Sequence, residues 1–150
     1  MREEVYDYLR NYGFSKEELR SFEDINDNIF FANLKEINKN IDFLTNKGLT
    51  KEEIIYIFKK NCFMITEKDN RLEALDNIYI NDLGLSNNLI KEIIINNPDT
   101  YSISPIELNK IINYLKENNF DKNKIINLIM KNPKIITLDY EEFIKLIKGV

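Results

Sequence analysis

The sequence predicts an all-α solenoid of about four two-helix repeats, each about 35 residues long, with a terminal capping helix. Three observations predict it. Residues of helix-capping type recur every 35 or 36 positions, apolar residues flank them, and Gly or Asn marks the turns. The predicted repeats are 1–32, 33–68, 69–103 and 104–138, with a cap at 139–150, all within a single domain. We expect the array to curve, to the right or to the left.

The second helix of each repeat begins at a recurring N-cap. Each cap follows an apolar residue and precedes another by four positions, which is the arrangement of a hydrophobic staple. The caps are Ser15, Thr50, Ser86 and Asp121. Glu18 and Glu53 lie three residues after the first two caps, where a capping box needs an acid. The predicted second helices span 16–23, 51–60, 87–96 and 122–131.

Another series of caps marks the first helix of the later repeats and the terminal helix. These caps are Asn33, Asp69, Ser104 and Asp139, and Pro105 takes the first helical position, where its missing N–H costs nothing. The turns before the second helices hold Gly13, Gly48, Gly84 and Asn119, the residue types that favour a left-handed C-terminal cap. The predicted first helices span 2–12, 34–46, 70–82 and 105–118, and the capping helix spans 140–148.

A return segment follows each second helix and carries recurring apolar residues. Pro98 and Pro133 stop two of the second helices, because Pro cannot continue the helical hydrogen bonds. We expect short irregular or 3-10 segments that pack on the core. Cys62, Ile94 and Ile129 are expected to be buried between repeats. The aromatic residues expected to face the core are Tyr56, Phe58, Tyr79, Tyr101 and Tyr114.

The residue types present exclude several kinds of catalysis. The chain has no His, which removes Ser-His-Asp and Cys-His catalysis and His-containing metal sites. The single Cys62 excludes an internal disulfide and is predicted to be a small buried hydrophobe rather than a nucleophile. Adjacent acids such as Glu17 and Glu18 lie in first helical turns, where they suit the helix dipole. We therefore predict no enzymatic activity, no cofactor, no metal site and no small-molecule substrate.

Hydropathy indicates a cytoplasmic protein. No segment approaches the roughly 20 consecutive apolar residues of a membrane span, and residues 1–5 lack a signal-peptide apolar core. We expect a bacterial or host cytosol and no membrane partner. Heavy use of Asn, Ile and Lys is typical of an AT-rich genome, such as that of a low-GC bacterium or one of its phages.

Two stretches carry a more specific pattern. They are Leu83-Gly84-Leu85-Ser86 through Asn97-Pro98, and Asn119-Phe120-Asp121 through Asn132-Pro133-Lys134-Ile135-Ile136. This pattern resembles the repeat of the mitochondrial transcription termination factor (mTERF) family, and the likeness covers residues 5–148. The resemblance implies a curved helical solenoid that binds duplex nucleic acid through a basic concave face in transcription regulation. The chain departs from the family pattern in its net charge of −4 and its few arginines.

Charge is unevenly distributed along the chain. Residues 1–34 hold four Lys or Arg and eight Asp or Glu, whereas residues 106–150 hold eight and six. The favoured interpretation is a protein-interaction adaptor or inhibitor, encoded by a phage or mobile element and acting on a nucleic-acid-handling host enzyme. Its acidic face would dock on a basic protein surface. The candidate residues are Glu3, Glu4, Asp7, Glu17, Glu18, Glu23 and Asp24.

The alternative is an mTERF-like nucleic-acid-binding protein. Lys and Arg supply most of the non-specific affinity for duplexes because they neutralise phosphates. The candidate residues are Lys122, Lys124, Lys131 and Lys134, along the last complete second helix and its return. Both interpretations stay open at this point.

Overall fold

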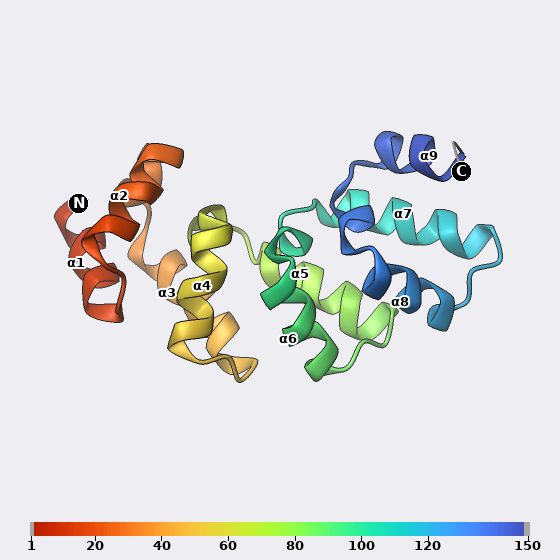
Figure 1. Cartoon of the computed structure of the whole chain (residues 1–150), viewed down its shortest axis with the longest axis horizontal. Helices are drawn as coiled ribbons and strands as arrows, with labels where there is room; N and C mark the ends of the chain where they lie inside the picture. The colour runs from red at the N-terminus through yellow and green to blue at the C-terminus, as the bar shows by residue number, and fades with distance from the viewer. Residues whose placement is uncertain (1, 149–150) are drawn as a thin grey trace. The chain divides into compact units, whose positions relative to one another are not determined.

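The computed structural model describes residues 2–148, and all regular structure in this range is helical (Figure 1). The α-helices are α1 (Arg2–Tyr12), α2 (Lys16–Ile25), α3 (Leu34–Asn46), α4 (Lys51–Lys60), α5 (Arg71–Asn77), α6 (Asn87–Asn96), α7 (Pro105–Glu117), α8 (Lys122–Lys131) and α9 (Tyr140–Lys148). Four 3-10 helices form the returns: η1 (Asp27–Phe31), η2 (Cys62–Thr66), η4 (Pro98–Tyr101) and η5 (Pro133–Thr137). The prediction of an all-α helical-repeat fold is confirmed.

The chain packs as two compact units, Met1–Asn70 and Arg71–Val150. The first unit contains α1 to α4, and the second contains α5 to α9. Their boundary lies close to the predicted boundary between the second and third repeats, at 68–69. That the whole chain forms one domain, and that it curves, stay predictions.

The second helices begin where the cap series predicts. Ser15 Oγ accepts a hydrogen bond from the Glu18 N–H at 3.0 Å, and Glu18 Oε1 accepts one from the Ser15 N–H at 2.8 Å. Thr50 and Glu53 form the same reciprocal box at α4. At α8 the Asp121 carboxylate accepts an amide N–H at 2.8 Å. Each bond satisfies an amide that has no partner inside its own helix.

The turns between paired helices have the left-handed backbone that Gly and Asn favour. The φ angles are +136° at Gly13, +90° at Gly48, +75° at Gly84 and +69° at Asn119. After α7, the Phe120 N–H donates to the Leu115 carbonyl at 2.9 Å, which is the long hydrogen bond of a Schellman motif. The predicted turn residues therefore end their helices in the expected way.

The core lies between the helices and the 3-10 returns. The apolar residues of the returns are buried, as predicted: Ile29, Phe30, Met64, Ile65, Tyr101, Ile103, Ile135 and Ile136. Cys62, Ile94 and Ile129 are also buried, which confirms their predicted burial, and their contact with a neighbouring repeat stays a prediction. Removal of these side chains from water supplies most of the energy that holds the repeats together.

Asp69 was predicted to cap the first helix of the third repeat, and this prediction is wrong. An N-cap residue has extended backbone angles, whereas Asp69 and its neighbour Asn70 both have φ of +58°. Asp and Asn tolerate this left-handed region better than other residues that carry a side chain. The helix α5 then begins at Arg71 and passes into a π-helical turn, η3 (Ile78–Asp82), before Gly84.

The aromatic residues follow the prediction with one exception. Phe58, Tyr79 and Tyr101 are buried, and Tyr114 is half-buried. Tyr56 was expected to face the core, but it is 44% exposed. The buried side chains of α4 follow positions 54, 57 and 58, so position 56 falls on the opposite side of the helix.

Two of these tyrosines form a buried pair with satisfied hydroxyls. The Tyr79 hydroxyl donates to the Thr100 carbonyl at 2.6 Å, and the Tyr101 hydroxyl donates to Asp76 Oδ1 at 2.8 Å. Burial raises the pKa of both phenols, and the nearby Asp76 charge raises that of Tyr101 further. Because the ring faces are covered, these residues serve the core rather than a stacking surface.

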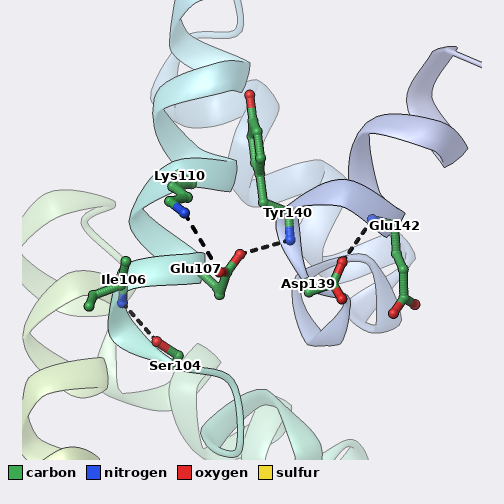
Figure 2. A network of polar contacts seen from close by, with 7 residues as sticks. All are labelled: Ser104, Ile106, Glu107, Lys110, Asp139, Tyr140 and Glu142. Atoms are coloured by element: carbon green, nitrogen blue, oxygen red, sulfur yellow. Dashed lines mark hydrogen bonds and ion pairs between the residues drawn. The ribbon is translucent and has the colours of Figure 1, made fainter.

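Polar contacts join α7 to α9 at their N-termini (Figure 2). Glu107 Oε2 accepts a hydrogen bond from the Tyr140 N–H at 2.8 Å, and Glu107 Oε1 lies 3.7 Å from Lys110 Nζ. Asp139 Oδ1 accepts the Glu142 N–H at 2.8 Å, so Asp139 caps α9 as predicted. These bonds fix the start of α9 against the preceding repeat.

Candidate functional site

The four candidate lysines lie on α8 and η5 of the second unit. Buried Ile125 and Ile129 fix one side of α8 to the core. All four lysine side chains are exposed: Lys122, Lys124, Lys131 and Lys134. The structure therefore places them on two consecutive elements, each accessible to a partner, with Lys122 on the opposite side of α8 from Lys124 and Lys131.

The spacing of two of these lysines suits an extended polyanion. Lys124 and Lys131 are seven residues apart, which is almost two helical turns, so both lie on one side of α8. At 1.5 Å per residue they are separated by about 10 Å along the helix axis. A strand of B-DNA advances about 3.4 Å per phosphate, so this distance corresponds to about three phosphates.

Lysines outnumber acids in this part of the chain, because residues 121–148 hold six Lys against the four exposed acids Asp121, Asp139, Glu141 and Glu142. Residues 122–138 contain four lysines and no Asp or Glu, and residues 143–148 add Lys145 and Lys148 without an acid. Lys145 and Lys148 are exposed on the second half of α9. These two lysines were not predicted as site residues because α9 was interpreted only as a cap, although their 3-residue spacing near the end of a predicted helix was visible.

A groove of about 780 Å³ lies beside the lysines. It is lined by residues of α8, η5, α9 and the segment between them: Leu128, Asn132, Lys134, Ile135, Leu138, Leu146 and Ile147. The lining is almost wholly apolar, with Lys134 as its one charged residue. Nothing in the cap spacing predicted this groove, because it depends on how α9 packs.

The seven candidate acids lie on α1 and α2, but they are not equivalent. Glu3, Glu4, Asp7, Glu17 and Asp24 are exposed. Glu18 and Glu23 are half-buried. Within the first unit, the structure therefore leaves five of the seven carboxylates openly accessible.

Glu18 has a structural role in the first unit. Its carboxylate caps Ser15 and also pairs with Lys59 Nζ at 3.3 Å. Partial burial by itself raises the pKa of Glu18, but the hydrogen bonds from Ser15 and the Lys59 charge outweigh it, so the pKa lies below its usual value. A carboxylate held in this way is less available to a binding partner.

The described residues were also considered for a reactive thiol, a metal site and a membrane-spanning helix. Cys62 is buried, and burial raises the pKa of its thiol, which disfavours the reactive thiolate. Among the described residues, no three Cys, Asp or Glu side chains gather as metal ligands. No helix within residues 2–148 is both long and apolar enough to cross a bilayer.

Exposed Tyr56 does not present a free ring face, because Lys60 Nζ lies 4.6 Å from its ring centroid.

Comparison with known families supplies the remaining observation. The sequence profile of the mTERF family matches residues 1–98 and 67–148, so the two matches together cover almost the whole chain. The chain belongs to the mTERF family. The overlap of the two matches is consistent with internal repeats in an mTERF array. A search of curated proteins found no significant match.

Proposed function

We propose that this mTERF-family chain is a non-enzymatic nucleic-acid-binding module that contacts phosphates through Lys122, Lys124, Lys131 and Lys134. The observation that carries the proposal is the run of exposed lysines along α8 and η5, within residues 122–138, which contain no Asp or Glu. Membership of a family whose members bind nucleic acid supports it. A role in transcription regulation is the corresponding biological expectation.

The physical basis is electrostatic. Each lysine that neutralises a phosphate releases a condensed counterion, which favours binding at low salt. The net charge of −4 opposes approach of a polyanion at long range. Screening limits that repulsion to about 8–10 Å at physiological ionic strength, so a local lysine surface can still bind. We expect affinity that is modest and strongly dependent on salt.

The test is fluorescence anisotropy with a labelled DNA duplex and a matched RNA duplex. Replacement of Lys122, Lys124, Lys131 and Lys134 by Gln should weaken binding about 10-fold or more at low salt. The matched control replaces four exposed lysines of the first unit, Lys35, Lys39, Lys60 and Lys68, and changes net charge equally. If both variants weaken binding equally, or if neither does, the α8 and η5 surface is not the interface.

A second candidate function is the protein adaptor or inhibitor. It is favoured by the five exposed carboxylates on α1 and α2. Charge reversal of these residues should slow association with a basic protein partner and reduce the salt dependence of that association. A pull-down with and without nuclease separates the two candidates, because a partner bridged by nucleic acid is lost after nuclease treatment.

A further inference from the structure

The groove beside α9 is the continuation of the interface between repeats. One repeat earlier in the array, the corresponding surface is covered: α9 packs on α7, and η5 packs on η4. Ile111 and Ile112 of α7 are buried. The residues 35 positions later are Leu146 and Ile147, which line the groove, and Leu146 is 45% exposed. The groove therefore has the residues of a helix-packing surface without the covering helix within residues 2–148.

The first repeat carries a charged residue at a position where the second repeat carries an apolar residue that packs on the repeat before it. In the first unit, Phe58 of α4 is buried and stacks on Phe14 at 6.2 Å between ring centroids. The position 35 residues before Phe58 is Glu23, and its neighbour is Asp24. The first repeat thus has charged residues where an inner repeat has apolar ones, as expected of a capping repeat. A second copy offering that charged side would fit the apolar groove poorly.

The charge around the groove further restricts its occupant. Lys134 lines the groove, and Lys131, Lys145 and Lys148 lie within three residues of other lining positions. Asp139 and Glu141 lie equally close to Leu138, so lysines outnumber acids around the groove by four to two. Two copies joined through this same face would bring lysines of like charge together, which disfavours a symmetric dimer. An occupant with acidic residues beside an apolar stripe would be attracted instead.

We propose that this groove binds an amphipathic helix of a partner protein, with an apolar stripe that covers Leu146 and acidic residues on its flanks. A helix in a groove uses apolar anchors at i, i+3 or i+4, and i+7, as the helices of this chain do on one another. This docking surface is additional to the proposed phosphate contacts, and Lys134 is the residue that both would share.

The test titrates the full chain with a synthetic peptide of about 15 residues that has Leu at the anchor positions and Glu on the flanks. Isothermal calorimetry should detect binding to the wild-type chain. Leu146→Asp should weaken that binding about tenfold or more, because it places a charge against an apolar stripe. The matched control is Ile106→Asp, which changes a 68% exposed apolar residue outside the groove and should have no effect.

Control peptides and a second variant test whether binding depends on the apolar stripe and on the acidic flanks. A scrambled peptide of the same composition and a peptide with Lys on its flanks should both bind much more weakly than the Glu peptide. Lys134→Glu should weaken the Glu peptide severalfold at low salt, without altering the apolar lining. Absence of peptide binding, or equal binding by the Leu146→Asp variant, would overturn the proposal.

Two results would show that the groove binds something other than a partner helix. If sedimentation shows a dimer that Leu146→Asp dissociates, the occupant is a second copy and the proposal fails. If Leu146→Asp weakens duplex DNA binding as much as peptide binding, the groove belongs to the nucleic-acid interface. Retained DNA binding by Leu146→Asp, together with loss of peptide binding, would support both proposals separately.

Discussion

Gly84 and Asn119 occupy equivalent turns with φ of +75° and +69°. No atom lies within 4 Å of where a Cβ on Gly84 would stand, so a substitution there affects only the backbone. We expect Gly84→Ala to lower the free energy of unfolding by about 1 kcal/mol. Asn119→Gly should leave it unchanged or raise it by about 0.5 kcal/mol. Urea denaturation measures both, and an unchanged midpoint for Gly84→Ala would contradict the left-handed turn.

Glu18 gives the fold a pH dependence. Because its folded-state pKa lies below the ordinary 4.5, its contribution to stability is present above that value and is lost as pH falls through the lowered pKa. Glu18→Gln should destabilise the chain at pH 7 and make stability fall less steeply below about pH 4.5. Urea denaturation across this range, with exposed Glu17→Gln as control, measures the effect. Parallel pH profiles for Glu18→Gln and wild type would contradict the assignment.

Ile94 tests the packing of α6. Its side chain is buried, so Ile94→Ala should lower the free energy of unfolding by about 2–4 kcal/mol. Ile106→Ala, at an exposed position, should cost less than about 0.5 kcal/mol. Similar losses for the two variants, measured by thermal or urea unfolding, would show that α6 is placed wrongly.

Single residues were predictable where their physics is local. Caps such as Ser15 and Thr50 are recognisable because a hydroxyl three residues before a Glu satisfies nearby amides. Asp69 belongs to the same residue class, but it has a left-handed backbone, which residue type alone does not distinguish from a cap because Asp suits both. Tyr56 was misplaced because residue type was given more weight than its angular position on α4.

Glu107 tests how one helix positions another. Its carboxylate accepts the first N–H of α9, and a hydrogen bond to a charged group contributes about 1.5–3 kcal/mol. We expect Glu107→Gln to speed hydrogen exchange of the α9 amides while leaving α1 to α4 unchanged. Lys110→Gln is the control, because Lys110 is half-exposed and its pair with Glu107 is long. Unchanged exchange in α9 would show that the Glu107–Tyr140 bond does not anchor it.

The helices themselves were predictable, whereas their packing details were not. Two interleaved cap series located the starts of the second helices and of most first helices, since caps and left-handed turns act within a few residues, and the start of α5 was the exception. The π-helical turn Ile78–Asp82 was not predictable, since it has no distinct residue signature. The groove was missed for another reason. It requires residues such as Asn132 and Ile147 to lie close together, which no repeat spacing reveals.

Across the whole chain, charge distribution is the feature on which both proposed functions rest. The acidic excess of residues 1–34 and the lysines of residues 122–148 were both visible in the sequence. The four lysine candidates are all exposed, whereas the Glu18 carboxylate caps Ser15 and pairs with Lys59. The choice between the two surfaces could not come from residue counts, because it depends on which charges the fold uses internally.

The most direct test of nucleic-acid binding by the lysine surface is the salt dependence of duplex affinity. For the wild-type chain, the logarithm of the binding constant should fall with the logarithm of salt concentration by about 0.9 per phosphate contact. Replacement of Lys122, Lys124, Lys131 and Lys134 by Gln should reduce that slope by about one for each phosphate that is no longer neutralised. The control with Lys35, Lys39, Lys60 and Lys68 replaced should keep the wild-type slope. An unchanged slope for the α8 and η5 variant, or no measurable duplex binding by the wild-type chain, would contradict the proposed function.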